Sequence, residues 1–110
     1  MATAYKVLGQ SNPSATTETT LYTVPSLTAT VVSSLTICNQ AASAATYRIA
    51  VRPSGQSSTT GPNWIVYGAT VAASDTTVLT LGLTMAAGDK IQVYASTSTL
   101  SFSSFGSEIS

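Results

Sequence analysis

Four side chains have the residue types and spacing of a contact site. Arg48 and Arg52 are four positions apart, and Trp64 and Tyr67 follow a polar segment. Residues four apart on a strand point to one face of the sheet and lie about 13 Å apart. Arginine and large aromatic side chains are enriched in protein interfaces. The sequence therefore predicts a subunit contact formed by Arg48, Arg52, Trp64 and Tyr67, and the alternative is a solvated or salt-bridged arginine pair, with Glu108 or Asp89 as partner.

The aromatic side chains allow a second interpretation. Trp64 and Tyr67, together with Tyr5, Tyr22 and Tyr94, could form a platform for a sugar ring. Large aromatic residues in a small β domain are more often core or interface anchors. A host surface glycan therefore stays an alternative ligand.

The ionisable residues give little basis for catalysis. The chain has no histidine, one cysteine (Cys38) and four carboxylates, which are Glu18, Asp75, Asp89 and Glu108. A glycosidase needs two carboxylates facing each other across the substrate, and a calcium loop needs a cluster of them. Asp75 and Asp89 follow Ala-Ala-Ser and Ala-Ala-Gly, where an aspartate typically caps a turn. Cys38 lies in an apolar run and is expected to be a small buried residue. We expect no enzyme, no cofactor and no metal site.

The overall composition narrows the classes of partner. Four basic and four acidic residues give zero formal charge and a pI near 6.0, and about one third of the chain is Ser or Thr. Such a chain has no field to attract nucleic acid or anionic lipid. Its start has no signal-peptide pattern and no run is apolar enough to span a bilayer, so we expect a soluble protein without a membrane contact.

These side chains must be positioned by strands. Turn residues recur at short intervals, and the segments between them are β-branched and alternate apolar with polar residues. We predict a single all-β domain over residues 1–110, an antiparallel β-sandwich or jelly-roll-like fold of about eight strands. The predicted strands are residues 4–9, 21–24, 30–39, 45–52, 64–67, 76–83, 90–95 and 100–105.

Alternation also predicts which side chains point inward. Tyr47, Ile49 and Val51 form one inward stripe, and three further stripes follow from the same period: Leu79, Leu81 and Leu83; Ile91, Val93 and Ala95; Leu100 and Phe102. The long third strand is expected to point Val31, Leu35 and Ile37 inward. Residues 40–44 are predicted to close a hairpin between the third and fourth strands. Residues 53–63 form the one long loop, either a mobile tip or a contact loop.

The edges of the sheets predict self-association. A β-sandwich normally protects its edge strands with lysines, prolines or inward-pointing charges. Two lysines and four prolines must serve every edge of this domain. Burial of edges or faces against other copies is the simplest solution, so we expect a homo-oligomer.

A resemblance to a known group of proteins rests on four segments: VLGQSNPSATTETTLYTVPS (Val7 to Ser26), VVSSLTICNQAASAATYRIAVRP (Val31 to Pro53), AAGDKIQVYAS (Ala86 to Ser96) and LSFSSFGSEI (Leu100 to Ile109). Together they resemble small virion structural proteins of tailed bacteriophages, including phages of cyanobacteria. The resemblance implies a non-enzymatic subunit of the particle, assembled in the host cytoplasm and released by lysis. It implies a capsid decoration (cement) protein docked on the major capsid or tail protein, with a homotrimer as one arrangement. The alternative is a neck, tail or fibre component that binds a receptor or glycan.

Overall fold

The computed structural model describes residues 2–110, which form eight strands and one short 3-10 helix. All eight predicted strands are present, and two of them, Ala45–Arg52 and Lys90–Ala95, have the predicted bounds. The strands are β1 (Thr3–Ser11), β2 (Thr19–Thr23), β3 (Ala29–Asn39), β4 (Ala45–Arg52), β5 (Trp64–Val71), β6 (Thr76–Met85), β7 (Lys90–Ala95) and β8 (Leu100–Ile109), with the helix η1 (Gly61–Asn63) before β5. Within these residues no helix is long and apolar enough to cross a membrane.

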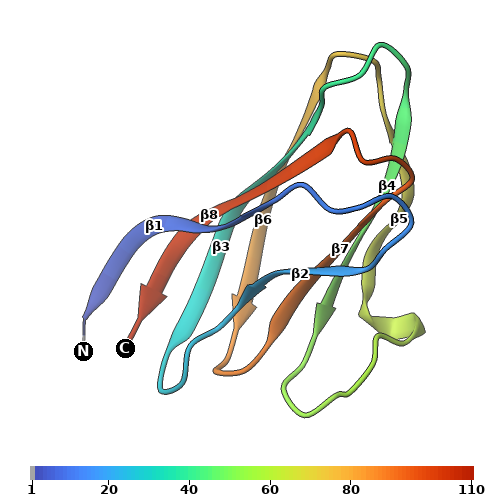
Figure 1. Cartoon of the computed structure of the whole chain (residues 1–110). Coiled ribbons are helices and arrows are strands. Elements are labelled where there is room, and N and C mark those ends of the chain that lie inside the picture. The colour runs from blue at the N-terminus through green and yellow to red at the C-terminus, as the bar shows by residue number, and fades with distance from the viewer. Residues whose placement is uncertain (1) are drawn as a thin grey trace.

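The strands form two antiparallel four-stranded sheets. One sheet has the order β1-β8-β3-β6 and the other has the order β2-β7-β4-β5. The chain passes from one sheet to the other at every connection except β4–β5, which stays within one sheet (Figure 1). This strand order is that of a jelly roll, so the predicted β-sandwich class is confirmed.

The core lies between the two sheets and follows the predicted stripes. Tyr47, Ile49, Ile91, Val93 and Phe102 are all buried, and Tyr47 packs edge-on against Phe102 with ring centroids 6.3 Å apart. Leu79, Leu81, Leu83 and Val51 pack against this cluster while staying partly exposed. Apolar burial between the sheets is the main favourable contribution to folding here.

The prediction for Val31 is wrong, and a bulge explains the error. Val31 is half-buried on the outer face, whereas its neighbour Val32 is fully buried. Ser33 is an extra residue in β3 opposite Gly106 and Phe105 of β8. An extra residue shifts the alternation by one position, so Val32 points to the same side of the sheet as Leu35 and Ile37.

The predicted hairpin at residues 40–44 is also wrong. β3 belongs to the first sheet and β4 to the second, so these residues cross between the sheets. Asn39 holds the crossing in place: its side-chain amide donates to the carbonyls of Ser43 and Ala72, and its Oδ1 accepts from the backbone N–H of Ala41.

The two ends of the described chain lie side by side. Ala2 and Ser110 exchange two backbone hydrogen bonds of 2.7 and 2.8 Å, which continue the pairing of β1 with β8. Figure 1 shows both ends at the same end of the sandwich. The strand orders leave four strands at the free edges of the sheets: β1 and β6 in one sheet, and β2 and β5 in the other.

Candidate functional site

Three predicted contact residues come together on the outer face of the β2-β7-β4-β5 sheet. Arg48 of β4 lies directly opposite Tyr67 of β5 and Tyr94 of β7, so these residues form one row across three strands. Trp64 lies opposite Ala50, on the same face as Arg48. We call Arg48, Trp64, Tyr67 and Tyr94 the arginine–aromatic cluster.

Two irregularities in β5 aim the aromatic side chains outward. Gly68 and Ile65 are skipped in the pairing with β4, which places Tyr67 opposite Arg48 and Trp64 opposite Ala50. Gly68 has a φ of 85°, a left-handed conformation that glycine adopts without strain. Bulges of this kind re-aim side chains at sheet edges. Without them, Trp64 and Tyr67 would point to opposite faces, since they are three positions apart.

The cluster is held by stacking. The guanidinium carbon of Arg48 lies 4.1 Å from the centre of the Tyr67 ring and 4.4 Å from that of Tyr94. Trp64 is 6.0 Å away and meets Tyr67 edge to face, with centroids 5.5 Å apart at 75°. Cation–π contacts of this kind each contribute about 0.5–2 kcal/mol. Tyr67 remains 64% exposed, so the cluster is accessible to a ligand.

Arg52 does not join the cluster. Its Nη1 lies 3.7 Å from Glu18 Oε2, and Thr59 donates a hydrogen bond to the same carboxylate oxygen. The predicted partners Glu108 and Asp89 are therefore wrong for Arg52. Its Nε is buried and has no hydrogen-bond partner in residues 2–110. Arg52 fastens the long loop and the start of β2 to the sheet, which is a structural role.

The second half of the loop of residues 53–63 is held by hydrogen bonds, one to Glu18 outside the loop and two within the loop. Thr59 bonds to Glu18, and Asn63 Oδ1 accepts hydrogen bonds from the backbone N–H and the hydroxyl of Thr60. Asn63 is buried, and η1 leads directly into Trp64. These contacts fix the entry of β5 and so the position of the cluster.

The second surface of interest is the outer face of the β1-β8-β3-β6 sheet. Within the described residues, β3 and β6 carry no charged side chain, and the only charged residues of β1 and β8 are Lys6 and Glu108. Lys6 donates to Glu108 Oε1 at 2.9 Å, and Tyr22 of the other sheet donates to Glu108 Oε2. Both charges therefore point toward the opposite sheet, and the outer face is neutral.

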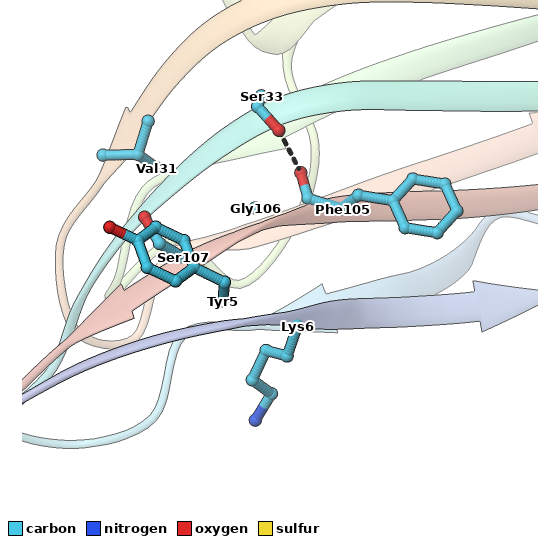
Figure 2. A pocket seen from close by; sticks show the side chains of 7 residues that line it. All are labelled: Tyr5, Lys6, Val31, Ser33, Phe105, Gly106 and Ser107. Carbon is cyan, nitrogen blue, oxygen red and sulfur yellow. Dashed lines mark hydrogen bonds between the residues drawn. The ribbon is translucent and has the colours of Figure 1, made fainter.

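This neutral face carries exposed apolar groups and a shallow groove. Tyr5, Val7 and Val78 are 86%, 49% and 61% exposed. The groove encloses about 430 Å³ over β1, β8 and β3. Figure 2 shows Tyr5 lying across Ser107, with Val31 beyond it and Lys6 pointing away from Tyr5. Ser33 donates to the carbonyl of Phe105 and closes one side. The groove is a shallow surface depression lined mainly by apolar groups.

The carboxylates have separate surroundings. Glu18 faces Arg52 and Thr59, and Glu108 faces Lys6 and Tyr22. Asp89 caps a turn as predicted, since it accepts from the backbone N–H groups of Ser54 and Ala86. Across residues 2–110, no group of three or more His, Cys, Asp or Glu side chains is arranged to hold a metal ion.

Two residues differ from the sequence expectation. Cys38 is half-buried on the neutral face, not in the core. Tyr94 was predicted only as part of a sugar platform, yet it forms one side of the stack on Arg48. Its outward position follows from the alternation that places Ile91, Val93 and Ala95 inward, so the signal was present in the sequence.

Comparison with known proteins adds no assignment: no family model, no curated protein and no solved structure matches this chain.

Proposed function

We propose that this chain is a non-enzymatic structural subunit of a bacteriophage particle, which assembles with copies of itself and docks on the major capsid or tail protein. A capsid decoration protein is the simplest form of this role. The particle setting rests on the resemblance of four sequence segments to small virion proteins. The assembly role rests on the neutral outer face and on the free edge of β6.

The observation that supports this proposal best is the contrast between β6 and the other edges. β2 has five residues, β1 carries Lys6, and β5 is interrupted by two bulges. Short strands, lysines and bulges are the usual protections against edge pairing. β6 has ten residues and carries neither a charge nor a proline. Its irregularity falls at residues 81–82, so Thr76 to Thr80 form a regular edge.

The neutral face adjoins this edge and adds apolar area to it. Val78 is exposed on β6, and Tyr5 and Val7 are exposed on β1 at the opposite side of the same sheet. Burial of apolar area drives association, and the absence of charges on the outer face removes the desolvation cost that charges impose. Several copies that each bind weakly can together bind a repeating shell with high avidity.

The proposal is tested in two steps. Sedimentation of the purified protein measures self-association, and imaging of particles that contain a tagged copy measures incorporation. We expect an oligomer in solution and a regular lattice of tags on the head. A monomer at every concentration tested, together with particles that lack the tag, would contradict the proposal.

The second candidate is a glycan-binding module at the arginine–aromatic cluster. It is favoured by the exposure of Tyr67 beside Trp64. Under this alternative, Trp64→Ala abolishes retention of the protein on immobilised host glycan and leaves particle incorporation intact. A Trp64→Ala protein that is retained as well as the parent contradicts the glycan role.

A further inference from the structure

Arg48 differs from the paired cations of this chain in the way it is held. Lys6 is paired with Glu108, and Arg52 lies beside Glu18. Arg48 is fixed by the rings of Tyr67 and Tyr94, which stack on it at 4.1 and 4.4 Å. Neither ring neutralises its charge, so Arg48 is a positioned but uncompensated cation. Arg52 and Lys90 lie four positions further along the same face, on β4 and β7, outside the stack.

The hydrogen-bonding groups of Arg48 remain free. Among residues 2–110 no carboxylate lies within ion-pair distance of its guanidinium and no side chain or carbonyl accepts a hydrogen bond from it. Within residues 2–110 the only buried side-chain nitrogen without a hydrogen-bond partner is Arg52 Nε, so the Arg48 nitrogens reach solvent. Stacking occupies the flat faces of a guanidinium and leaves its N–H donors pointing outward in the plane.

We propose that the arginine–aromatic cluster is a carboxylate-binding site, and that its occupant is an Asp or Glu side chain of the protein on which this chain docks. A planar guanidinium with free in-plane donors matches a carboxylate through two parallel hydrogen bonds. Stacking has already ordered the Arg48 side chain, so little side-chain entropy is lost on binding. The inference rests on the proposed docking role.

Other anionic partners fit the cluster less well. Nucleic acid and anionic membranes bind through several cations at once, and this cluster offers one. A sugar needs open ring faces for stacking, and Arg48 covers one face each of Tyr67 and Tyr94. Trp64, Tyr67 and Arg48 are the residue types that dominate protein–protein hot spots. An acidic side chain framed by apolar groups on a partner protein is therefore the best match.

The test uses capped amino acids as probes and NMR as the readout. The protein is titrated with N-acetyl-glutamate amide and, as the matched neutral probe, with N-acetyl-glutamine amide. We expect saturable shifts at the Arg48 Nε–H group and the Tyr67 ring with the acidic probe only. Equal shifts with both probes, or no shift with either, would overturn the site.

Three variants separate the site from general electrostatics. Arg48→Gln should weaken binding of the acidic probe about tenfold or more, because the charge-assisted hydrogen bonds are lost. Arg48→Lys keeps the charge and should also weaken binding, because an ammonium cannot form the paired bonds. Lys90→Gln removes a cation from β7 outside the stack and should leave binding unchanged. An equal loss in the Lys90 variant, or none in both Arg48 variants, would contradict the inference.

Two further measurements fix the source of the carboxylate and its relation to the docking role. Glucuronate that binds more than about tenfold tighter than the capped glutamate would overturn the protein assignment in favour of an acidic sugar. Parent protein that binds the acidic probe but is absent from particles means that the docking role has failed, while the site stands. If the protein enters particles but does not bind the acidic probe, this inference alone has failed.

Discussion

Glu108 links the two sheets through a small polar network. Its Oε1 accepts from Lys6 Nζ at 2.9 Å and its Oε2 accepts from the Tyr22 hydroxyl at 2.5 Å. Tyr22 also shares a 2.8 Å hydrogen bond with Thr30, so strands of both sheets meet here. The bonds from Tyr22 and Lys6 lower the pKa of Glu108, whereas burial and the bond to Glu108 raise the pKa of Tyr22 to about 12.

This network predicts how stability depends on pH. A carboxylate with a lowered folded-state pKa contributes stability above its unfolded pKa, and that contribution is lost as pH falls through the folded value. Tyr22 has a raised pKa, so its contribution is complete below the unfolded value of 10.0 and is lost as pH rises toward about 12. Burial also raises the pKa of Tyr47, which adds to the alkaline loss.

The Tyr22→Phe variant tests this assignment by urea unfolding across the acidic range. Removing one hydrogen-bonded partner of a buried group costs about 1–3 kcal/mol, so we expect a loss of that size at neutral pH. The difference from the parent should shrink as pH falls, because Glu108 becomes protonated in both proteins. Glu108→Gln serves as the control and should flatten the acidic part of the profile. A constant difference at all pH values would rule out the ionic role of Glu108.

Gly106 is required by close packing of the central strands. It lies in β8 between β1 and β3, and a Cβ at this position would overlap the carbonyl oxygen of Val31 and lie 3.0 Å from the Val32 Cα. Both contacting atoms belong to the backbone of β3, which cannot move aside without disturbing the hydrogen bonds between β3 and β8. We expect Gly106→Ala to destabilise the fold by about 1–3 kcal/mol, measured by thermal or urea unfolding.

Gly82→Ala is the matched control for this substitution. Gly82 lies on edge strand β6, and a Cβ there meets no atom within 4 Å. Its effect should be small or slightly stabilising, since alanine restricts the unfolded chain. Equal losses for both variants would show that the overlap at Val31 is relieved in solution.

At the scale of strands, local patterning was sufficient to predict each element but not its partners. The β-branched segments with a period of two predicted eight strands, because this period reports the half-buried surface of a sheet. Val31 was wrongly predicted to point inward, because Ser33 becomes an extra residue only when β3 is paired with β8, and a single strand does not show this pairing. The connection at residues 40–44 was mistaken for a hairpin, because the assignment of β3 and β4 to different sheets is a property of the whole topology.

For the candidate site too, the residues were predictable from the sequence, but the contacts that bring them together or separate them were not. Arg48, Trp64 and Tyr67 were expected in one contact surface, and the structure brings them together. Their meeting depends on the bulges at Ile65 and Gly68, which no local pattern indicated. The separation of Arg52 depends on Glu18, which is distant in the sequence and reaches Arg52 only through the fold.

The β6 edge makes its own prediction. Val78 is 61% exposed, so Val78→Lys should cost the folded monomer little while placing a charge on the regular part of the edge. We expect sedimentation to show weaker self-association in this variant. Ile65→Lys, an exposed position on edge strand β5 of the other sheet, is the control and should associate like the parent. Loss of association in the Ile65 variant alone would move the interface to the other sheet.

At the scale of the molecule, the sandwich is long and thin, and its two faces differ. Its extents are 45 × 28 × 19 Å, and the two sheets expose a neutral face on one side and the arginine–aromatic cluster on the other. Two outer faces of different character would allow the proposed self-association and the proposed docking to use separate surfaces.

If copies associate through the β6 edge and the neutral face, stability must depend on concentration. Association binds the folded state only, so mass action raises the melting temperature as protein concentration increases. We expect the midpoint of thermal unfolding to rise by a few degrees over an about hundredfold concentration range, since about 1 kcal/mol shifts the midpoint of a domain of this size by about 4–8 °C. The Val78→Lys protein should lose this dependence while it keeps the midpoint of the dilute parent. A parent midpoint that is the same at every concentration would mean that the free edge of β6 is stable alone in water, and the assembly role would then have to rest on the arginine–aromatic cluster.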